Sequence, residues 1–174
     1  MSAHDVETLL ELNSIDRSSF DEKLYNTMIL GVFEALCKDI KKSHTKIEEK
    51  EKYRKSNDKV AVTKRIVKKY VGCILEEEDY EKLSILLKAF FSKSNTRKQF
   101  DVQYKKTLIE SQNNRCRICG KAINLKDAHL DHIIPWDYVG DEISDNYQML
   151  CETCNKRKGT AAYFEISMML LNKS

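Results

Sequence analysis

Two cysteine pairs, Cys116-Arg-Ile-Cys119 and Cys151-Glu-Thr-Cys154, enclose the sequence Asp131-His-Ile-Ile-Pro135, and Asn155 follows the last cysteine. Each Cys-x2-Cys pair places two sulfurs on one edge of a tetrahedron, so two pairs complete a four-sulfur zinc site. The interval between the pairs, residues 120–150, is longer than in a common zinc ribbon, which indicates an inserted hairpin. The sequence therefore predicts a structural zinc ion bound by Cys116, Cys119, Cys151 and Cys154.

The residues inside and just after the inserted segment suit phosphodiester hydrolysis. That reaction needs a nucleophilic water, relief of charge at the phosphate, and help for the leaving oxygen. Asp131 offers a carboxylate and Asn155 an amide oxygen to a hard divalent cation, Mg²⁺ or Mn²⁺. His132 can accept the proton of the water, because the pKa of histidine lies near neutral pH. An Asp-His pair is often an ordinary surface pair, but the cysteine pairs and Asn155 favour the catalytic interpretation.

In order and spacing these motifs resemble the HNH, or ββα-metal, endonucleases over about residues 100–160. Asp131–Pro135 is similar to the first strand of that family. Asp145–Leu150 is similar to the loop and strand that lead into its helix, and Cys151–Gly159 is similar to the helix. The zinc-bound form of the family carries both cysteine pairs.

The resemblance implies His132 as the general base, Asp131 as a metal ligand, and Asn146 as the residue that braces the loop and keeps His132 oriented. A plain turn at Asn146 is the structural alternative. The third signature position of the family is often histidine. Here it is Asn155, as in the HNH domain of RNA-guided nucleases, and an amide oxygen fits magnesium better than a softer metal.

The predicted fold is α+β and mostly α. A helical region of unknown role, residues 1–95, precedes residues 96–174, which hold a small zinc-stabilised ββα-metal domain and a C-terminal helix from Thr160. Ser18-Ser19 can cap the first long helix, a second begins near Val60, and the connector is Ser92–Thr96. Apolar residues recur at helical spacing and are expected to be buried; they include Leu24, Met28, Ile29, Phe33, Leu36, Cys37, Ile66, Val67, Ile74, Ile85 and Phe90.

Basic residues at two places are candidates for nucleic-acid contact. Lys64, Arg65, Lys68 and Lys69 form a stripe at helical spacing, which either contacts DNA phosphates or is a solvated helix face. Lys158 lies one helical turn beyond Asn155, where it can reach the scissile phosphate. Lys156 and Arg157 are nearer to the flanking backbone.

Composition limits the class of protein. The 174 residues carry a net charge of +3, which is too small to indicate nucleic-acid binding by itself. The N-terminus lacks a secretion signal and no apolar run is long enough for a membrane span, so we expect no membrane partner and a cytoplasmic location, where paired cysteines usually bind metal.

The sequence thus predicts an endonuclease that hydrolyses DNA, nicking it as a monomer or cutting both strands as a dimer. The setting can be restriction, phage defence, a mobile element or phage packaging. The alternatives are a nuclease subunit of a larger complex and a zinc-dependent DNA-binding module without catalysis. The helical region can serve a homodimer or a partner protein.

Overall fold

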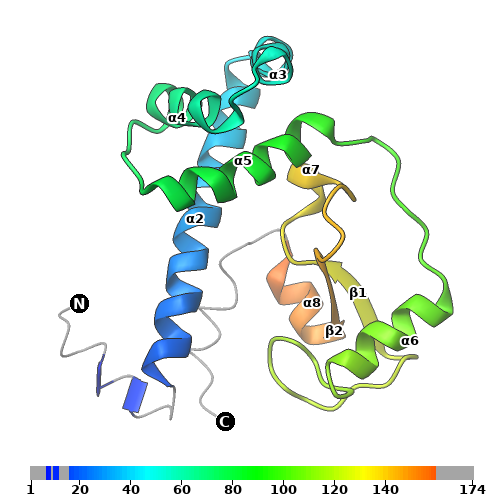
Figure 1. Ribbon diagram of the computed structural model, residues 1–174. Coiled ribbons are helices and arrows are strands. Elements are labelled where there is room, and N and C mark those ends of the chain that lie inside the picture. The colour runs from blue at the N-terminus through cyan, green and yellow to red at the C-terminus, as the bar shows by residue number, and fades with distance from the viewer. Residues whose placement is uncertain (1–6, 9, 12–15, 160–174) are drawn as a thin grey trace. The chain divides into compact units, whose positions relative to one another are not determined.

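The computed structural model describes residues 7–8, 10–11 and 16–159 (Figure 1). The helix predicted from Thr160 lies outside these residues. The described chain is mostly α-helical with one small antiparallel sheet, so the predicted α+β class is confirmed. Within the described ranges, we find no helix whose length and apolarity would let it cross a membrane.

The elements follow one another as α2 (Arg17–Lys42), α3 (Lys46–Lys55), α4 (Lys59–Tyr70), α5 (Glu77–Ser92), α6 (Val102–Ser111), β1 (Ala128–His132), α7 (Trp136–Val139), β2 (Tyr147–Cys151) and α8 (Glu152–Lys158). They divide into two compact units. The helical unit comprises Ile29–Arg97 and Pro135–Ser144. The hairpin unit comprises Lys98–Ile134, residues 145–159 and the described residues up to Met28.

The helical unit is built on the packing of α4 and α5, with α3 against α4. Its core contains Phe33, Leu36, Ile66, Leu87 and Phe90, which are fully or almost fully buried. The rings of Phe33 and Phe90 meet edge to face with 6.5 Å between centroids. Apolar residues at helical spacing in the sequence thus form the core of this unit.

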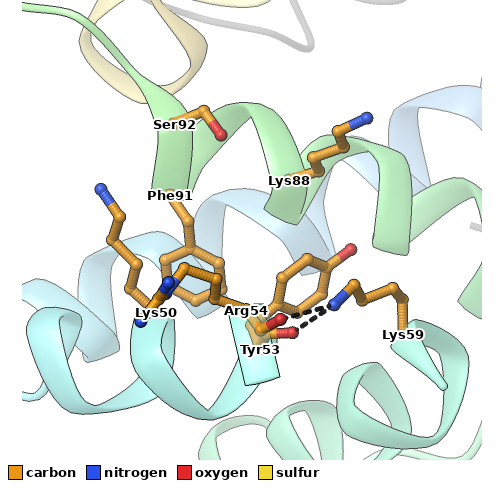
Figure 2. A pocket seen from close by; sticks show the side chains of 7 residues that line it. All are labelled: Lys50, Tyr53, Arg54, Lys59, Lys88, Phe91 and Ser92. Carbon is orange, nitrogen blue, oxygen red and sulfur yellow. Dashed lines mark hydrogen bonds between the residues drawn. The ribbon is translucent and has the colours of Figure 1, made fainter. Parts of the chain in front are cut away.

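A lysine closes the C-terminal end of α3. The Lys59 ammonium donates hydrogen bonds to the backbone carbonyls of Tyr53 at 2.7 Å, Arg54 at 3.1 Å and Ser56 at 2.5 Å. Figure 2 shows the bonds to Tyr53 and Arg54 beside a pocket between α3 and α5, whose volume is about 220 Å³. A cation at this end suits the negative pole of the helix.

Three local predictions were wrong. Asp16, not Ser18 or Ser19, caps α2, because the Asp16 carboxylate accepts from the Ser19 amide at 2.8 Å. The N-terminal part of the predicted apolar stripe is exposed, with Met28 at 63%. Ile74 is 94% exposed because α4 ends at Tyr70 and Gly72, at φ +76°, turns the chain away.

Ile85 is a fourth exception, with 65% of its surface exposed on α5. Its neighbours Leu83 and Leu87 are fully buried, so Ile85 lies outside the buried stripe of that helix.

The segment between β1 and β2 begins with a short helix of the helical unit. Pro135 precedes α7, whose Trp136 indole donates to the buried Asp141 carboxylate at 3.1 Å. The Lys93 ammonium lies 3.7 Å from the centroid of the Trp136 ring, and the Tyr138 hydroxyl donates to Glu34 at 3.3 Å. Both aromatic residues therefore anchor this loop.

The hairpin unit is organised around β1 and β2. The antiparallel register pairs Asp131 with Gln148 and His132 with Tyr147. Both strands contact α8, whereas α6 packs against β2 (Figure 1). Because successive side chains of a strand point to opposite faces, Asp131 and His132 project to different sides of the sheet.

Candidate metal centre and active site

The four cysteines of the two pairs converge in the hairpin unit. Their sulfur atoms all lie within 4.8 Å of one another, and the sulfurs of Cys119 and Cys151 are 3.9 Å apart. Zinc bonds of about 2.3 Å to four tetrahedral sulfurs require sulfur separations of about 3.8 Å. The cluster is therefore compatible with a structural zinc ion, as the spacing predicts.

Local structure explains this convergence. The first pair lies on a knuckle in which Cys116 and Lys121 are joined by a backbone hydrogen bond of 2.8 Å and Gly120 takes φ +69°. In the second pair, the Cys151 sulfur caps α8 by accepting from the Cys154 amide at 3.4 Å. The buried Leu150 packs with Cys116 and Cys154, so an apolar shell covers one side of the cluster.

The backbone also prepares one thiol for metal binding. Burial alone would raise the pKa of Cys116, but hydrogen bonds from the backbone of Cys119, Cys151 and Ile118 outweigh it and lower the pKa to about 7. Burial raises the pKa of Cys154, and its contacts with the sulfurs of Cys119 and Cys151 raise it further. A cation among the four sulfurs would favour the thiolate form of all of them.

Asp131 lies on the face of the sheet that contacts α8. Its Oδ2 atom accepts hydrogen bonds from Gln148 Nε2 and from the Lys158 ammonium, each at 2.9 Å. Lys158 also donates to the backbone carbonyl of His132 at 2.8 Å, and only 4% of its surface is exposed. Lys158 therefore contacts the residues of the predicted active site directly.

The Asp131 carboxylate and the Asn155 amide offer oxygen ligands, which a hard divalent cation prefers. Among the described residues, the contacts of the carboxylate reach Oδ2 and none reaches Oδ1. Asn155 lies three residues before Lys158 on α8, a spacing that places two side chains on the same side of a helix. The buried Gln148 Oε1 also has no donor in the described part of the chain, so a polar atom beside Asp131 is left without a partner.

His132 lies on the opposite face, among aromatic rings. Its ring is 4.9 Å from that of Tyr147, centroid to centroid. Tyr147 in turn packs against Phe100 at 4.6 Å and against Tyr104 of α6 at 6.0 Å. The aromatic cluster limits the orientations open to the half-buried imidazole.

Asn146 closes the loop that joins the two strands. Its Oδ1 accepts from the Ile134 amide at 2.7 Å, and its Nδ2 donates to the Ile134 carbonyl at 2.9 Å. The Asn146 carbonyl also accepts from the Ile133 amide at 3.0 Å, and the side chain is buried. One amide thus pairs both backbone groups of the residue two positions after His132.

Residues 116–161 match the family model of the HNH endonucleases. This segment is an HNH domain. The match covers both cysteine pairs, β1, β2 and α8, and it indicates a nuclease of the HNH family. No curated protein and no solved structure matches the chain.

The predicted basic stripe lies outside the HNH domain and is largely paired. Arg65 and Lys69 both bind the fully buried Glu49, at 2.6 and 2.7 Å, and Lys64 binds Glu77 at 2.5 Å. Lys68 is exposed. These ion pairs reduce the positive charge that three of the four residues offer to phosphates.

Within the HNH domain, Lys156 pairs with Glu152 one turn earlier on α8, at 2.5 Å, and both side chains are exposed. Arg157 is exposed as well. Lys156 and Arg157 therefore lie on the solvent side of α8, whereas Lys158 faces Asp131.

The contacts of the HNH domain involve two residues that the sequence analysis did not single out. Gln148 bonds to Asp131, and Tyr147 contacts the ring of His132. Both occupy the positions of β2 directly opposite their partners. Tyr147 and Gln148 directly follow Asn146 in the sequence. Only the strand register places them opposite His132 and Asp131.

Proposed function

We propose that the chain is a metal-dependent endonuclease that hydrolyses phosphodiester bonds of DNA. The observation that carries the proposal is the match of residues 116–161 to the HNH family model, a segment in which Asp131 and His132 end β1 and the partner strand runs into the cysteine cluster. A binding module without catalysis has no need of this carboxylate, this imidazole and Asn155 together.

A bound Mg²⁺ or Mn²⁺ would supply charge relief at the phosphate and at the leaving oxygen. Asp131, through Oδ1, and Asn155, through its amide oxygen, would hold that ion. Both ligands are oxygens, as these cations prefer. With two protein ligands, positions remain for waters and for phosphate oxygens.

His132 is the proposed general base, which takes a proton from the attacking water. The neighbouring Tyr147 ring restricts the His132 imidazole. The bond from the Lys158 ammonium to the His132 carbonyl holds the strand. The bonds of Asn146 to Ile134 hold the chain just after His132, which supports the loop-bracing role.

One HNH domain carries one such site and normally cuts one strand. Cleavage of both strands would therefore need a dimer or a second nicking event. A nuclease subunit that is active only within a larger complex is the second candidate. The helical unit, which forms a compact body of its own, is then the proposed partner surface.

Cleavage measured against metal concentration tests the assignment. Zinc-loaded wild-type protein should nick supercoiled plasmid with Mg²⁺ or Mn²⁺, and omission of both should abolish nicking. Asp131→Ala removes the charged ligand, so activity should be lost at every Mg²⁺ concentration. Asn155→Ala removes a neutral ligand, so high Mg²⁺ should restore part of the activity. An identical response of the two variants would contradict the ligand assignment.

A further inference from the structure

Burial of the charged Lys158 side chain against Asp131 costs free energy, because both groups lose contact with water. Lysine is among the residues least often buried, yet Lys158 is 4% exposed and the Asp131 side chain 16%. The pair forms beside the proposed metal position and not at a distant place in the core. Its ammonium has acceptors in Asp131 Oδ2 and in the His132 carbonyl.

The pair divides the two oxygens of the Asp131 carboxylate. Oδ2 already accepts from Lys158 and Gln148, both at 2.9 Å. A divalent cation is thereby restricted to Oδ1, where it can be bound by one oxygen only. The carboxylate is oriented before any ion arrives, because two donors from α8 and β2 hold the same atom.

The pair also removes the charge that would attract a cation. Asp131 contributes one negative charge and Lys158 one positive charge at contact distance, and Asn155 is neutral. Burial strengthens the effect, because water screens the ammonium weakly there. Asp131, Lys158 and Asn155 together thus present no net negative charge to a divalent cation in the free protein.

We propose that Lys158 acts as a built-in counter-cation that keeps the divalent-ion site weak in the free protein, so that the ion binds firmly only when a substrate phosphate adds negative charge. Lys158 is here a positioning residue, which acts through Asp131. The inference rests on the proposed nuclease function for the identity of the phosphate. The coupling links ion binding to the presence of DNA.

A simpler role would be structural: Lys158 could serve to fasten α8 to β1. The two roles predict opposite changes in the affinity for a divalent cation when Lys158 is removed. If Lys158 only holds the structure, its removal loosens Asp131 and weakens ion binding. If Lys158 neutralises the site, its removal strengthens ion binding even though Asp131 loses one donor, since Gln148 remains.

Binding of Mn²⁺, measured by electron paramagnetic resonance of the free ion, separates the roles. The zinc-loaded protein without DNA is compared with Lys158→Met and with Lys158→Gln, which keeps a hydrogen-bond donor but no charge. Both variants should bind Mn²⁺ about tenfold more tightly or better, the scale on which neighbours of a ligand change metal affinity. Circular dichroism and zinc content establish that each variant is folded.

Lys156→Met is the matched control. It removes the same charge from α8 two residues away, where the side chain is exposed, so Mn²⁺ affinity should stay within about twofold of the wild-type value. Adding Asp131→Ala to Lys158→Met should abolish the gained affinity. Equal tightening by Lys156→Met would mean a general charge effect and would overturn the proposal.

A second arm adds a DNA duplex in a His132→Ala background, which slows cleavage enough for ion binding to be measured first. DNA should raise Mn²⁺ affinity strongly when Lys158 is present and much less in Lys158→Met. Unchanged or weaker Mn²⁺ binding by both Lys158 variants without DNA would overturn the proposal and leave the nuclease assignment standing. Absence of cleavage by the wild-type protein is a separate result that would remove the nuclease assignment and the role of DNA.

Discussion

Asp131 and His132 are neighbours in the chain but lie in different surroundings. Strand alternation sends Asp131 toward α8, where charged and amide groups bind it, and His132 toward the ring of Tyr147. A carboxylate oriented by donors suits a cation, and an imidazole held by a ring suits proton transfer. Both residues stand at the C-terminal end of β1, where the strand leads into the loop that Asn146 holds.

Two asparagines of the HNH domain should respond differently to removal. Asn146→Ala leaves both backbone groups of Ile134 without their partners, at a buried position. We expect a loss of about 1–3 kcal/mol in the free energy of unfolding, measured by urea denaturation. Asn155→Ala should change that free energy by less than about 0.5 kcal/mol, since no bond to the Asn155 side chain is seen in the described chain. Equal losses would contradict the division.

At the scale of the elements, α3 is joined to α4 by a buried carboxylate. Glu49 of α3 accepts from Arg65 at 2.6 Å, Lys69 at 2.7 Å and Tyr70 at 3.0 Å. The interaction explains why the charged segment after Lys46, which has almost no apolar stripe, is a helix packed on the unit. Its buried side consists of one carboxylate and the ring of Tyr53.

This carboxylate gives stability a defined dependence on pH. Burial raises the pKa of Glu49, but the bonds from Arg65, Lys69 and Tyr70 outweigh it and lower the pKa from 4.5 to about 2. The contribution is thus complete above pH 4.5 and is lost as the pH falls toward 2. It amounts to roughly 2 kcal/mol after screening by solvent at the half-exposed Arg65 and Lys69.

Urea denaturation at pH values from 6 down toward the lowered pKa of Glu49, about 2, measures this dependence. Glu49→Gln should be less stable at pH 6, and the difference from the wild type should shrink below pH 4.5. Glu48→Gln is the matched control, because Glu48 is exposed and pairs with the exposed Lys52 on the same helix. A constant difference across the pH range would show that Glu49 contributes no proton-linked stability.

The sequence predicted those features that depend on short spacing. Cys-x2-Cys pairs, the strand that contains Asp131 and the helix after Cys151 are local patterns, and the structure shows the four sulfurs together. The burial of Lys158, the bond of Gln148 to Asp131 and the pairing of Arg65 with Glu49 depend on how distant elements meet. Helical periodicity also failed to show where α4 ends, because Gly72 decides that locally.

At the scale of the molecule, the chain enters the helical unit between the two strands of the HNH domain. Residues 135–144 belong to that unit, although His132 precedes them and Asn146 follows them. The division of the chain into residues 1–95 and 96–174 stays a prediction. The hairpin unit has a small core, so zinc should contribute much of its folding energy.

Removal of the zinc should unfold one unit before the other. Cys151→Ser takes away a ligand, so amide hydrogen exchange should lose protection in residues 98–134 and 145–159, while residues 29–97 keep most of theirs. Cys73→Ser is the control, since Cys73 is no part of the cysteine cluster. Elemental analysis should give one zinc per wild-type chain and almost none in Cys151→Ser. A folded hairpin unit without zinc would refute the structural role.

The measurement that tests the central claim most directly is the rate of plasmid nicking by zinc-loaded wild-type protein and by His132→Ala at saturating Mg²⁺. His132→Ala leaves Asp131 and Asn155 in place, so it should retain DNA and metal binding while the rate falls by about 10²-fold or more. Undiminished cleavage by His132→Ala would contradict the mechanism. Absence of cleavage by the wild type under all metal conditions would contradict the assignment as a nuclease active on its own.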